Sequence, residues 1–166
     1  MSIIHVRIDE RLIHGQVATM WTNTLHATRI MVVDDDASEN STVKMTLKLA
    51  TPTGVSLSVL GIERAATRIN EGAYDQQKVF MVVKSPLTLV SLIDLGVHLE
   101  EVNVGNIYDK KDKINVASSI YISKEMADAF YALNDAGIHL VKQLVPSHKV
   151  EEFMPLLEAA VSKEEK

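Results

Sequence analysis

The stretch IIHVRIDERLIHGQV, residues 3–17, joins an apolar run, a charged turn and the start of an amphipathic segment. Its first part, IIHVRI (3–8), is rich in Ile and Val and predicts a β-strand. Asp9 to Gly15 form the turn, and a helix is expected to begin about Gln16, where apolar residues take up helical spacing. A strand, a short turn and a helix in that order begin a βαβ unit, so the stretch predicts an α/β fold.

Short apolar runs alternate with longer amphipathic segments along the rest of the chain. Further strands are predicted at 29–34, 55–60, 78–83 and 139–144, with weaker candidates at 101–106 and 114–119. Helical spacing recurs at 62–69, 86–96, 123–137 and 150–157. The alternation predicts an open, mostly parallel sheet with helices on both faces.

Ligands of such sheets bind beyond the carboxyl ends of the strands. The segments that leave the strands are therefore the places where a site is expected. They are 9–15, which follows the first strand, and 34–40, 84–86 and 105–111.

Length and composition restrict the class of protein. A chain of 166 residues is long enough for one domain with its own core, and we expect a single domain at 1–162 and a charged tail at 163–166. The N-terminus becomes charged too early for a signal peptide, and no apolar run approaches the roughly 20 residues of a membrane helix. The net charge of −5 argues against nonspecific nucleic-acid binding. The absence of cysteine excludes disulfides and thiolate metal sites, and it suits a reducing cytoplasm without requiring one.

The turn after the first strand has the parts of a site that carries a phosphoryl group. His14 would lie just before a helix N-terminus, where free N–H groups and the helix dipole favour an anion, and Gly15 would let the backbone approach that anion. Arg11 can offer a bidentate guanidinium to phosphate oxygens, and its charge should help to keep His14 neutral and nucleophilic. Asp9 would either fix the imidazole tautomer or orient Arg11. From spacing alone, a structural loop histidine remains the alternative.

The acidic run Asp34–Asp36 and Lys84 resemble the acidic cluster and lysine of a response-regulator receiver. The strand at 55–60, however, reaches Gly61 without the aspartate that a receiver would phosphorylate. A solvated turn that caps the next helix is the simpler interpretation of the acidic run, although Asp34 would lie on the same edge as His14.

The remaining motifs carry little functional signal. Ser85 could donate a hydrogen bond to a phosphoryl oxygen, but N-capping ahead of Pro86 explains it equally well. No glycine-rich nucleotide fingerprint occurs, which disfavours a nucleotide-binding enzyme. None of the other five histidines has a partner at metal-ligand spacing, so no metal site is expected.

The stretch VRIDERLIHGQV (6–17) closely resembles the signature of the IIB component of the mannose/sorbose-type sugar phosphotransferase system. Three later stretches are similar to that family more loosely: VDDDASENSTVKMTLKLATP (33–52), KSPLTLVSLIDLGV (84–97) and EVNVGNIYDKK (101–111). The chain departs from the family pattern at Gly105-Asn106, where a pair of glycines is expected. The family pattern therefore does not predict the conformation of the chain around Gly105, whereas the histidine motif is complete.

The resemblance implies a cytoplasmic phosphocarrier that reaches the membrane only through its partners. It would take a phosphoryl group from a IIA phosphohistidine and give it to a sugar held by membrane-embedded IIC and IID subunits. The family's phosphorylated histidine falls on His14 and its phosphate-steadying arginine on Arg11. Gly15, Gln16 and Ser85 are expected to contact the phosphoryl group, and no cofactor is required. The rival interpretation is a regulatory or ligand-binding α/β module in which His14 is structural.

Two further expectations concern the same turn. The first follows from the need for partners to reach His14, and the second from the weakness of exposed ion pairs. The turn should be exposed, with Leu12 and Ile13 as the nearest apolar docking contacts. For Ile13, packing in the core is the alternative. Arg11 should form at most an exposed ion pair, which contributes about 0–1 kcal/mol, so Arg11→Ala should barely change stability.

Overall fold

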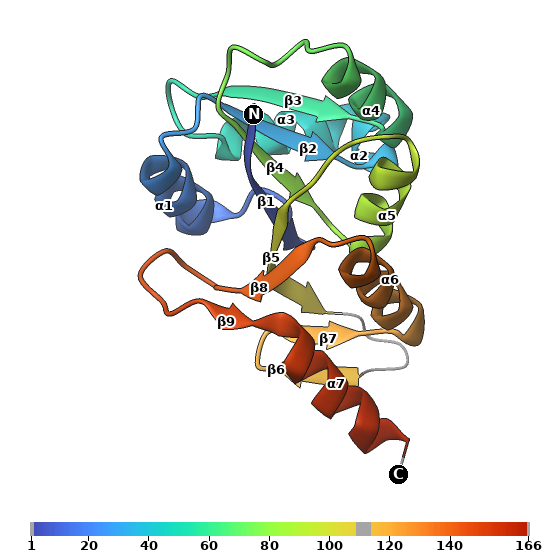
Figure 1. The fold of residues 1–166 in the computed structure, drawn as a ribbon. Helices are drawn as coiled ribbons and strands as arrows, with labels where there is room; N and C mark the ends of the chain where they lie inside the picture. Colours follow the sequence, from blue (N-terminus) through green and yellow to red (C-terminus); the bar gives the residue numbers. More distant parts are fainter. Residues whose placement is uncertain (1, 109–113, 166) are drawn as a thin grey trace.

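The computed structural model describes residues 2–108 and 114–165, in which nine strands and seven helices form an α/β structure (Figure 1). The strands are β1 (Ile3–Asp9), β2 (Arg29–Val33), β3 (Ser56–Leu60), β4 (Val79–Val83), β5 (Glu101–Tyr108), β6 (Ile114–Ala117), β7 (Ile120–Ile122), β8 (His139–Lys142) and β9 (Glu151–Glu152). The helices are α1 (Gly15–Leu25), α2 (Asp35–Ser38), α3 (Ser41–Ala50), α4 (Ile62–Asn70), α5 (Pro86–Asp94), α6 (Lys124–Asp135) and α7 (Phe153–Glu164).

The sheet is open and mostly parallel, as predicted. Its main path runs in the order β3-β2-β4-β1-β5-β7-β6, and β8 also pairs with β5. Within the described residues, only the β6–β7 and β8–β9 pairs are antiparallel. β7 and β9 were not predicted, because strands of three and two residues are too short to show a periodic pattern.

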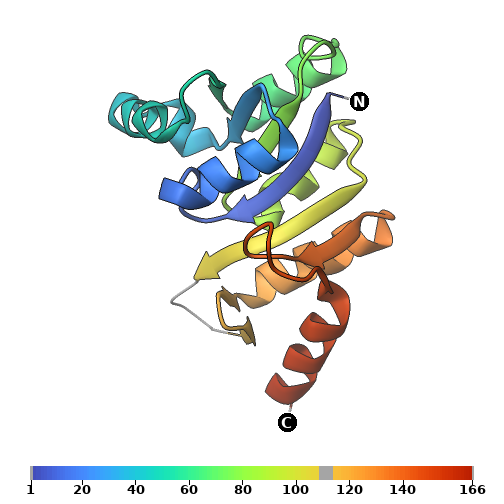
Figure 2. The same ribbon diagram turned by 90° about the vertical axis from the view of Figure 1, so that its left-hand side faces the viewer.

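Helices cover both faces of the sheet. α1 and α3 lie on one face, and α4, α5 and α6 lie on the other (Figures 1 and 2). The strand residues accordingly divide into two apolar clusters, one with α1 to α3 and the other with α4 to α7. β4 is buried at every position, which explains its nearly continuous apolar sequence.

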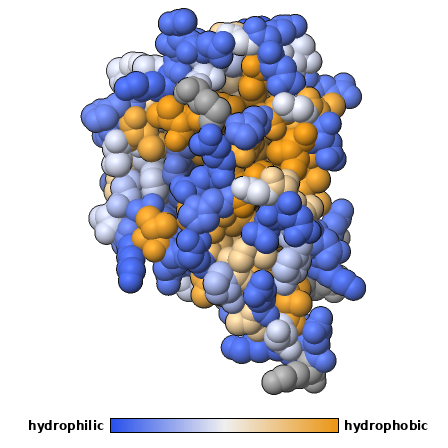
Figure 3. All heavy atoms as spheres, viewed as in Figure 1, coloured by the Kyte–Doolittle hydropathy of each residue, from blue (hydrophilic) through white to orange (hydrophobic). Residues whose placement is uncertain are grey.

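The C-terminal helix α7 extends the structure beyond the main sheet. Phe153, at its start, packs on Phe130 of α6 with the ring centroids 4.6 Å apart. α7 ends at Glu164, so two residues of the tail expected at 163–166 are helical. In the space-filling view of Figure 3, hydrophilic side chains dominate this projecting end, and hydrophobic atoms show mainly in the part above it.

Most predicted boundaries differ from the observed ones by one or two residues, but the helix predicted at 150–157 spans Phe153–Glu164. Another difference matters for the site. The sequence predicted that residues 105–111 leave the strand. β5 instead continues to Tyr108, so Gly105 and Asn106 lie inside the strand. Residues 109–111 of that expected segment lie outside the described part of the chain.

The strand order places two turns next to each other. β1 and β4 are neighbours, but the chain leaves β1 for α1 on one face and leaves β4 for α5 on the other (Figure 1). This reversal is the topological switch point at which open α/β sheets form their binding crevices. The turn that holds His14 lies at this point.

Candidate functional site

The turn between β1 and α1 is strained and open. α1 begins at Gly15, one residue earlier than expected, and His14 is its N-cap residue, with extended φ and ψ of −129° and 108°. Leu12 and Gly15 have positive φ angles of 62° and 46°. For a residue such as Leu12 the left-handed conformation costs roughly 1–2 kcal/mol. Strain of this kind is concentrated at functional sites, so it supports a site here.

The side chains of the turn separate into buried and exposed groups. Leu12 and Ile13 are each only 6% exposed and pack in the cluster beneath α1, so the expectation that they form docking contacts is wrong. The left-handed residue at position 12 turns the chain and directs both side chains inward. His14, Gly15 and Gln16 are exposed, as expected for a histidine that partners must reach.

The start of α1 leaves backbone donors free. The His14 side chain makes no capping hydrogen bond, and the first turn of the helix contains no acidic residue. Within the described part of the chain, no group accepts a hydrogen bond from the N–H of Gly15, Gln16 or Val17. Unpaired N–H groups at a helix N-terminus attract anions, and phosphate is a common ligand of such ends.

The Asp9 carboxylate orients Arg11. Asp9 is 1% exposed, and its Oδ1 and Oδ2 accept hydrogen bonds from Nε and Nη2 of Arg11, each at 3.0 Å. The Arg11 backbone N–H also donates to Oδ1, at 3.0 Å. These hydrogen bonds raise the pKa of Arg11. Asp9 was expected either to fix the imidazole tautomer of His14 or to orient Arg11. Among the described residues no hydrogen bond joins Asp9 to His14, so the structure shows the second role.

The buried carboxylate also changes the expectation for stability. The Arg11 side chain is 32% exposed but its partner Asp9 is 2% exposed, so this is not a surface ion pair. Removing Arg11 would take two charge-assisted hydrogen bonds from a buried anion. A cost of about 1.5–3 kcal/mol is therefore expected in place of a negligible one.

Arg7 lies on the other side of Asp9, and sequence reasoning missed it. Its side chain is 2% exposed, with Nη2 3.5 Å from Oδ2 of Asp9 and Nη1 donating to the carbonyl oxygen of Gln143 at 3.1 Å. Its guanidinium carbon lies 5.7 Å from the centroid of the Trp21 ring. Burial lowers the pKa of Arg7, although Asp9 opposes this shift, and an arginine remains charged. An arginine inside an apolar strand needs a buried partner, which was the available signal.

Gly105 makes room for this guanidinium. A Cβ atom at position 105 would overlap the Cζ, Nη1 and Nη2 atoms of Arg7. The first glycine of the expected pair is therefore required by packing. Asn106, where the second glycine was expected, accepts a hydrogen bond from the N–H of Glu10 with its carbonyl oxygen, so its backbone supports the turn.

A further layer connects the turn to the segment after β8. The Asn103 side chain makes two hydrogen bonds of 2.9 Å with the backbone of Gln143, and Trp21 Nε1 donates to the Leu144 carbonyl oxygen at 3.1 Å. His5 stacks on Trp21 with the ring centroids 4.7 Å apart. Burial, with the charge of Arg7, lowers the pKa of His5 to about 4, so its imidazole is neutral at pH 7. This layer fixes Arg7 and, through Asp9, Arg11.

The other predicted site residues serve mainly as helix caps. Ser85 Oγ accepts a hydrogen bond from the Leu87 N–H at 3.1 Å, and Asp34 Oδ2 accepts one from the Ala37 N–H at 2.9 Å. Lys84 lies 3.7 Å from Asp34. No hydrogen bond or ion pair between described residues connects these side chains to His14, although Ser85 follows the strand next to β1.

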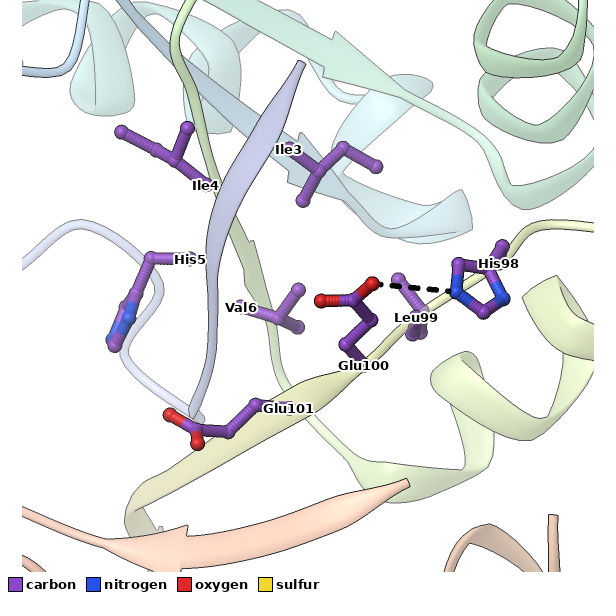
Figure 4. Close-up of a pocket in the computed structure, with 8 residues that line it drawn as sticks. All are labelled: Ile3, Ile4, His5, Val6, His98, Leu99, Glu100 and Glu101. Carbon is purple, nitrogen blue, oxygen red and sulfur yellow. Dashed lines mark ion pairs between the residues drawn. The ribbon is translucent and has the colours of Figure 1, made fainter. Parts of the chain in front are cut away.

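A separate hollow of about 90 Å³ lies at the amino ends of β1 and β5, away from the turn (Figure 4). Its ion pair joins His98 and Glu100 at 3.7 Å, and both side chains are about 70% exposed. Amino ends of parallel strands are not where such sheets bind ligands, so the candidate site stays at His14. In the described residues no cluster of three or more His, Asp or Glu suited to a metal ion is found, and no helix has the length and apolar character to cross a membrane.

Comparison with known proteins assigns the family. The family described as "PTS system sorbose subfamily IIB component" matches residues 3–166. The chain belongs to this family. The resemblance inferred from residues 6–17 is therefore confirmed.

Individual relatives agree with the assignment. This IIB chain is 31% identical over 157 residues to the fructose-specific EIIB component of Bacillus subtilis, with 95% of this chain and 96% of that protein covered. It is 32% identical over 157 residues to the mannose-specific EIIAB component of Escherichia coli K12, with 95% of this chain but 49% of that longer protein covered. The chain is also similar to the crystal structure of the IIBSor domain of the sorbose permease from Klebsiella pneumoniae, with a TM-score of 0.91 and 26% identity. The match covers 96% of this chain and 98% of that one.

Proposed function

We propose that His14 accepts a phosphoryl group from a IIA phosphohistidine and passes it to a sugar bound by membrane IIC and IID subunits. The observation that carries this proposal is the exposed His14 at the uncapped start of α1, beside a guanidinium held by a buried carboxylate. A structural histidine would be expected to be buried or to cap the helix with its side chain, and the exposed His14 side chain makes no capping hydrogen bond with a described residue.

The chemistry requires two successive in-line displacements. In the first, a ring nitrogen of His14 attacks the phosphorus, a new N–P bond forms, and the N–P bond of the donor breaks with its electron pair returning to the donor imidazole. In the second, a sugar hydroxyl oxygen attacks the phosphorus and forms an O–P bond, its proton passing to a base or water beside the sugar, while the His14 N–P bond breaks with its electron pair returning to the imidazole. Positioning and charge stabilisation supply most of the catalysis in such transfers.

Each neighbouring group has a definite role in this proposal. Arg11 stabilises the charge on the equatorial oxygens, and Asp9 positions Arg11. The free N–H groups of Gly15 and Gln16 bind phosphoryl oxygens, as a helix N-terminus does for phosphate. Ser85, whose oxygen already caps α5, can still donate its hydroxyl hydrogen from the adjacent turn. No cofactor or metal enters either step.

The partners follow from the family. The mannose-specific relative is named as a joint EIIAB component, which supports a IIA partner for this chain. The protein would act in the cytoplasm as a single phosphocarrier domain, residues 1–162, at the membrane only while bound to IIC and IID. A regulatory module that binds ligands but carries no phosphoryl group is the alternative.

Labelling with radioactive phosphoenolpyruvate and the upstream carriers tests the proposal. The wild type should gain one acid-labile, base-stable phosphoryl group, and His14→Ala should gain none. His148→Ala, which removes another exposed histidine, is the matched control and should be labelled normally. An unlabelled wild type would favour the regulatory module, and labelling of His14→Ala would refute the assignment of the residue.

A further inference from the structure

β3 forms one edge of the sheet. Among the described strands it pairs only with β2, and Figure 1 shows it at the rim, with α3 behind it. The Ser56 N–H donates to Thr28 and the Leu60 carbonyl oxygen accepts from Asp34, so the backbone groups of alternate residues from Ser56 to Leu60 face β2. The N–H and C=O groups of Leu57 and Val59 therefore point outward.

These outward groups have no hydrogen-bond partner in the part of the chain that the structure describes. Leu57 and Val59 are partly exposed. An unpaired strand edge is a template for another extended chain, and proteins usually cover it, shorten it or charge its surroundings. The residues around this edge therefore indicate what it can bind.

A hollow of about 680 Å³ lies along this edge, between β3 and α3. We call it the β3 groove. It is defined by Leu57 and Val59 of β3 with Val55 just before the strand, and by Lys44 and Lys48 of α3 with its C-cap residue Thr51. None of the residues lining it is acidic, although the chain carries a net charge of −5. Neither lysine forms an ion pair with a described residue.

We propose that the β3 groove binds an extended acidic segment of a partner protein, which adds to β3 as a further strand. The segment's backbone would pair with the outward groups of Leu57 and Val59, as in other cases of strand addition. Its side chains on the α3 side would lie between the apolar row of β3 and the two lysines.

The spacing of the lysines specifies the sequence of the segment. Lys44 and Lys48 are one helical repeat of four residues apart, or about 6 Å along α3. Residues i and i+2 of an extended strand are separated by about 6.6 Å and point to the same face. Acidic residues at alternate positions would therefore match the two lysines, and apolar residues between them would face the opposite side of the sheet.

Charge disfavours a second copy of this chain as the occupant. An antiparallel pairing of two β3 edges in one continuous sheet would put both α3 helices on the same face. Lys44 and Lys48 of one copy would then face the same lysines of the other, with no acidic residue of the groove between them. An acidic segment meets the same groove with attraction.

The groove is separate from the proposed phosphoryl site. β2 and β4 lie between β3 and β1 in the sheet, so an occupant of the groove leaves His14 open. A partner held there would raise the effective concentration of any domain tethered to it. The inference does not depend on the transfer chemistry, because its test measures binding alone.

The test uses a blocked eight-residue peptide in which Glu and Val alternate. Hydrogen–deuterium exchange of the Leu57 and Val59 amides should slow at least tenfold when the peptide saturates the full-length protein. A peptide with Lys in place of Glu should leave exchange unchanged, and so should the acidic peptide N-methylated at every residue, which has no backbone donor left on either edge.

Charge reversal provides the protein-side control. Lys44→Glu with Lys48→Glu should weaken peptide binding at least tenfold in an NMR titration. Lys124→Glu with Lys163→Glu changes the net charge equally at exposed lysines outside the groove, and should bind as the wild type does. The N-methylated peptide keeps the test valid if the first variant folds poorly.

Four results would overturn the inference. The first is unchanged exchange at Leu57 and Val59 with the acidic peptide, and the second is equal binding of the basic peptide. The third is protection of these amides that rises with protein concentration in the absence of peptide. The fourth is displacement of the peptide by millimolar inorganic phosphate. The third result would indicate a second copy, and the fourth a small-anion site.

Discussion

The turns after β1 and β4 lie at the same edge of the sheet, yet their helices begin differently. α5 begins with Ser85, whose hydroxyl oxygen accepts a hydrogen bond from Leu87, and with Pro86, which has no N–H to satisfy. The N-cap residue of α1 is His14, whose side chain makes no capping hydrogen bond, and among residues 2–108 and 114–165 nothing accepts a hydrogen bond from the N–H groups that follow it. The first turn of α5 is therefore capped by its own side chain, whereas the first turn of α1 has no side-chain cap.

The two turns also differ in the support beneath them. The β4 turn needs a serine and a proline, which are local features that a sequence pattern shows directly. The β1 turn depends on Asp9 between Arg7 and Arg11, and on a left-handed Leu12 held by its buried side chain. The proposed phosphoryl turn is thus the one whose conformation also depends on distant parts of the chain, through the contacts of Glu10 with Asn106 in β5 and of Arg7 with Gln143 after β8.

The largest expected difference between the turns is in the rate of phosphoryl transfer. Arg11→Ala should slow transfer from the IIA donor by roughly one to three orders of magnitude, the scale of losing one charge-stabilising donor. Arg11→Lys should restore part of the rate, because lysine lacks the planar fork. Ser85→Ala, in the β4 turn, removes only one neutral hydroxyl donor and should slow transfer by about threefold or less. Quenched-flow measurement decides, and a wild-type rate for Arg11→Ala would remove Arg11 from the mechanism.

The next largest effect concerns the support of the β1 turn. Gly105→Ala should lower the free energy of unfolding by about 3 kcal/mol, because the added methyl group displaces a fully buried guanidinium. Urea denaturation measures this loss. In the double variant Gly105→Ala with Arg7→Ala, the methyl group has room. The loss of unfolding free energy in the double variant should therefore be clearly smaller than the sum of the losses in the two single variants. Strict additivity would show that the guanidinium is not what excludes the side chain.

The same difference between local and distant contacts explains which parts of this candidate site the sequence predicted. His14, Arg11 and the sheet edge were predictable, because strand and helix periodicity and the charged turn are local features. Arg7 and Gly105 were not identified, since the contact between them joins β1 to β5 and has no periodic pattern. The burial of Leu12 was missed because a positive φ at a leucine cannot be foreseen from residue type.

Acid should weaken the support of the β1 turn in a defined pH range. The unfolded chain protonates His5 near pH 6.5 and the folded protein only near pH 4, so between these values the unfolded state binds more protons. Stability from this group should fall by about 2 kcal/mol between pH 6.5 and pH 5. His5→Phe keeps a ring against Trp21 and cannot titrate, so its pH profile should be flatter than that of the wild type. Parallel profiles would contradict the low pKa of His5.

The smallest expected effect is at the capped helix start. Ser85→Ala removes the hydroxyl that caps α5 and should cost about 1 kcal/mol of unfolding free energy. Thermal or urea unfolding is sufficient to detect it. His14→Ala should cost less, since the His14 side chain makes no capping hydrogen bond. If the two variants were equally destabilised, the two helix starts would not differ in the way described.

The most direct test of the central claim follows the backbone amides of both turns when the protein is phosphorylated. In ¹⁵N–¹H spectra recorded before and after transfer from the IIA donor, the N–H signals of Gly15 and Gln16 should move downfield and exchange more slowly with solvent, because they donate to phosphoryl oxygens. The Leu87 N–H already donates to Ser85 and not to the phosphoryl group, so its signal should move far less. A phosphorylated protein in which Gly15 and Gln16 are unchanged would contradict the claim that the open start of α1 is the phosphate site.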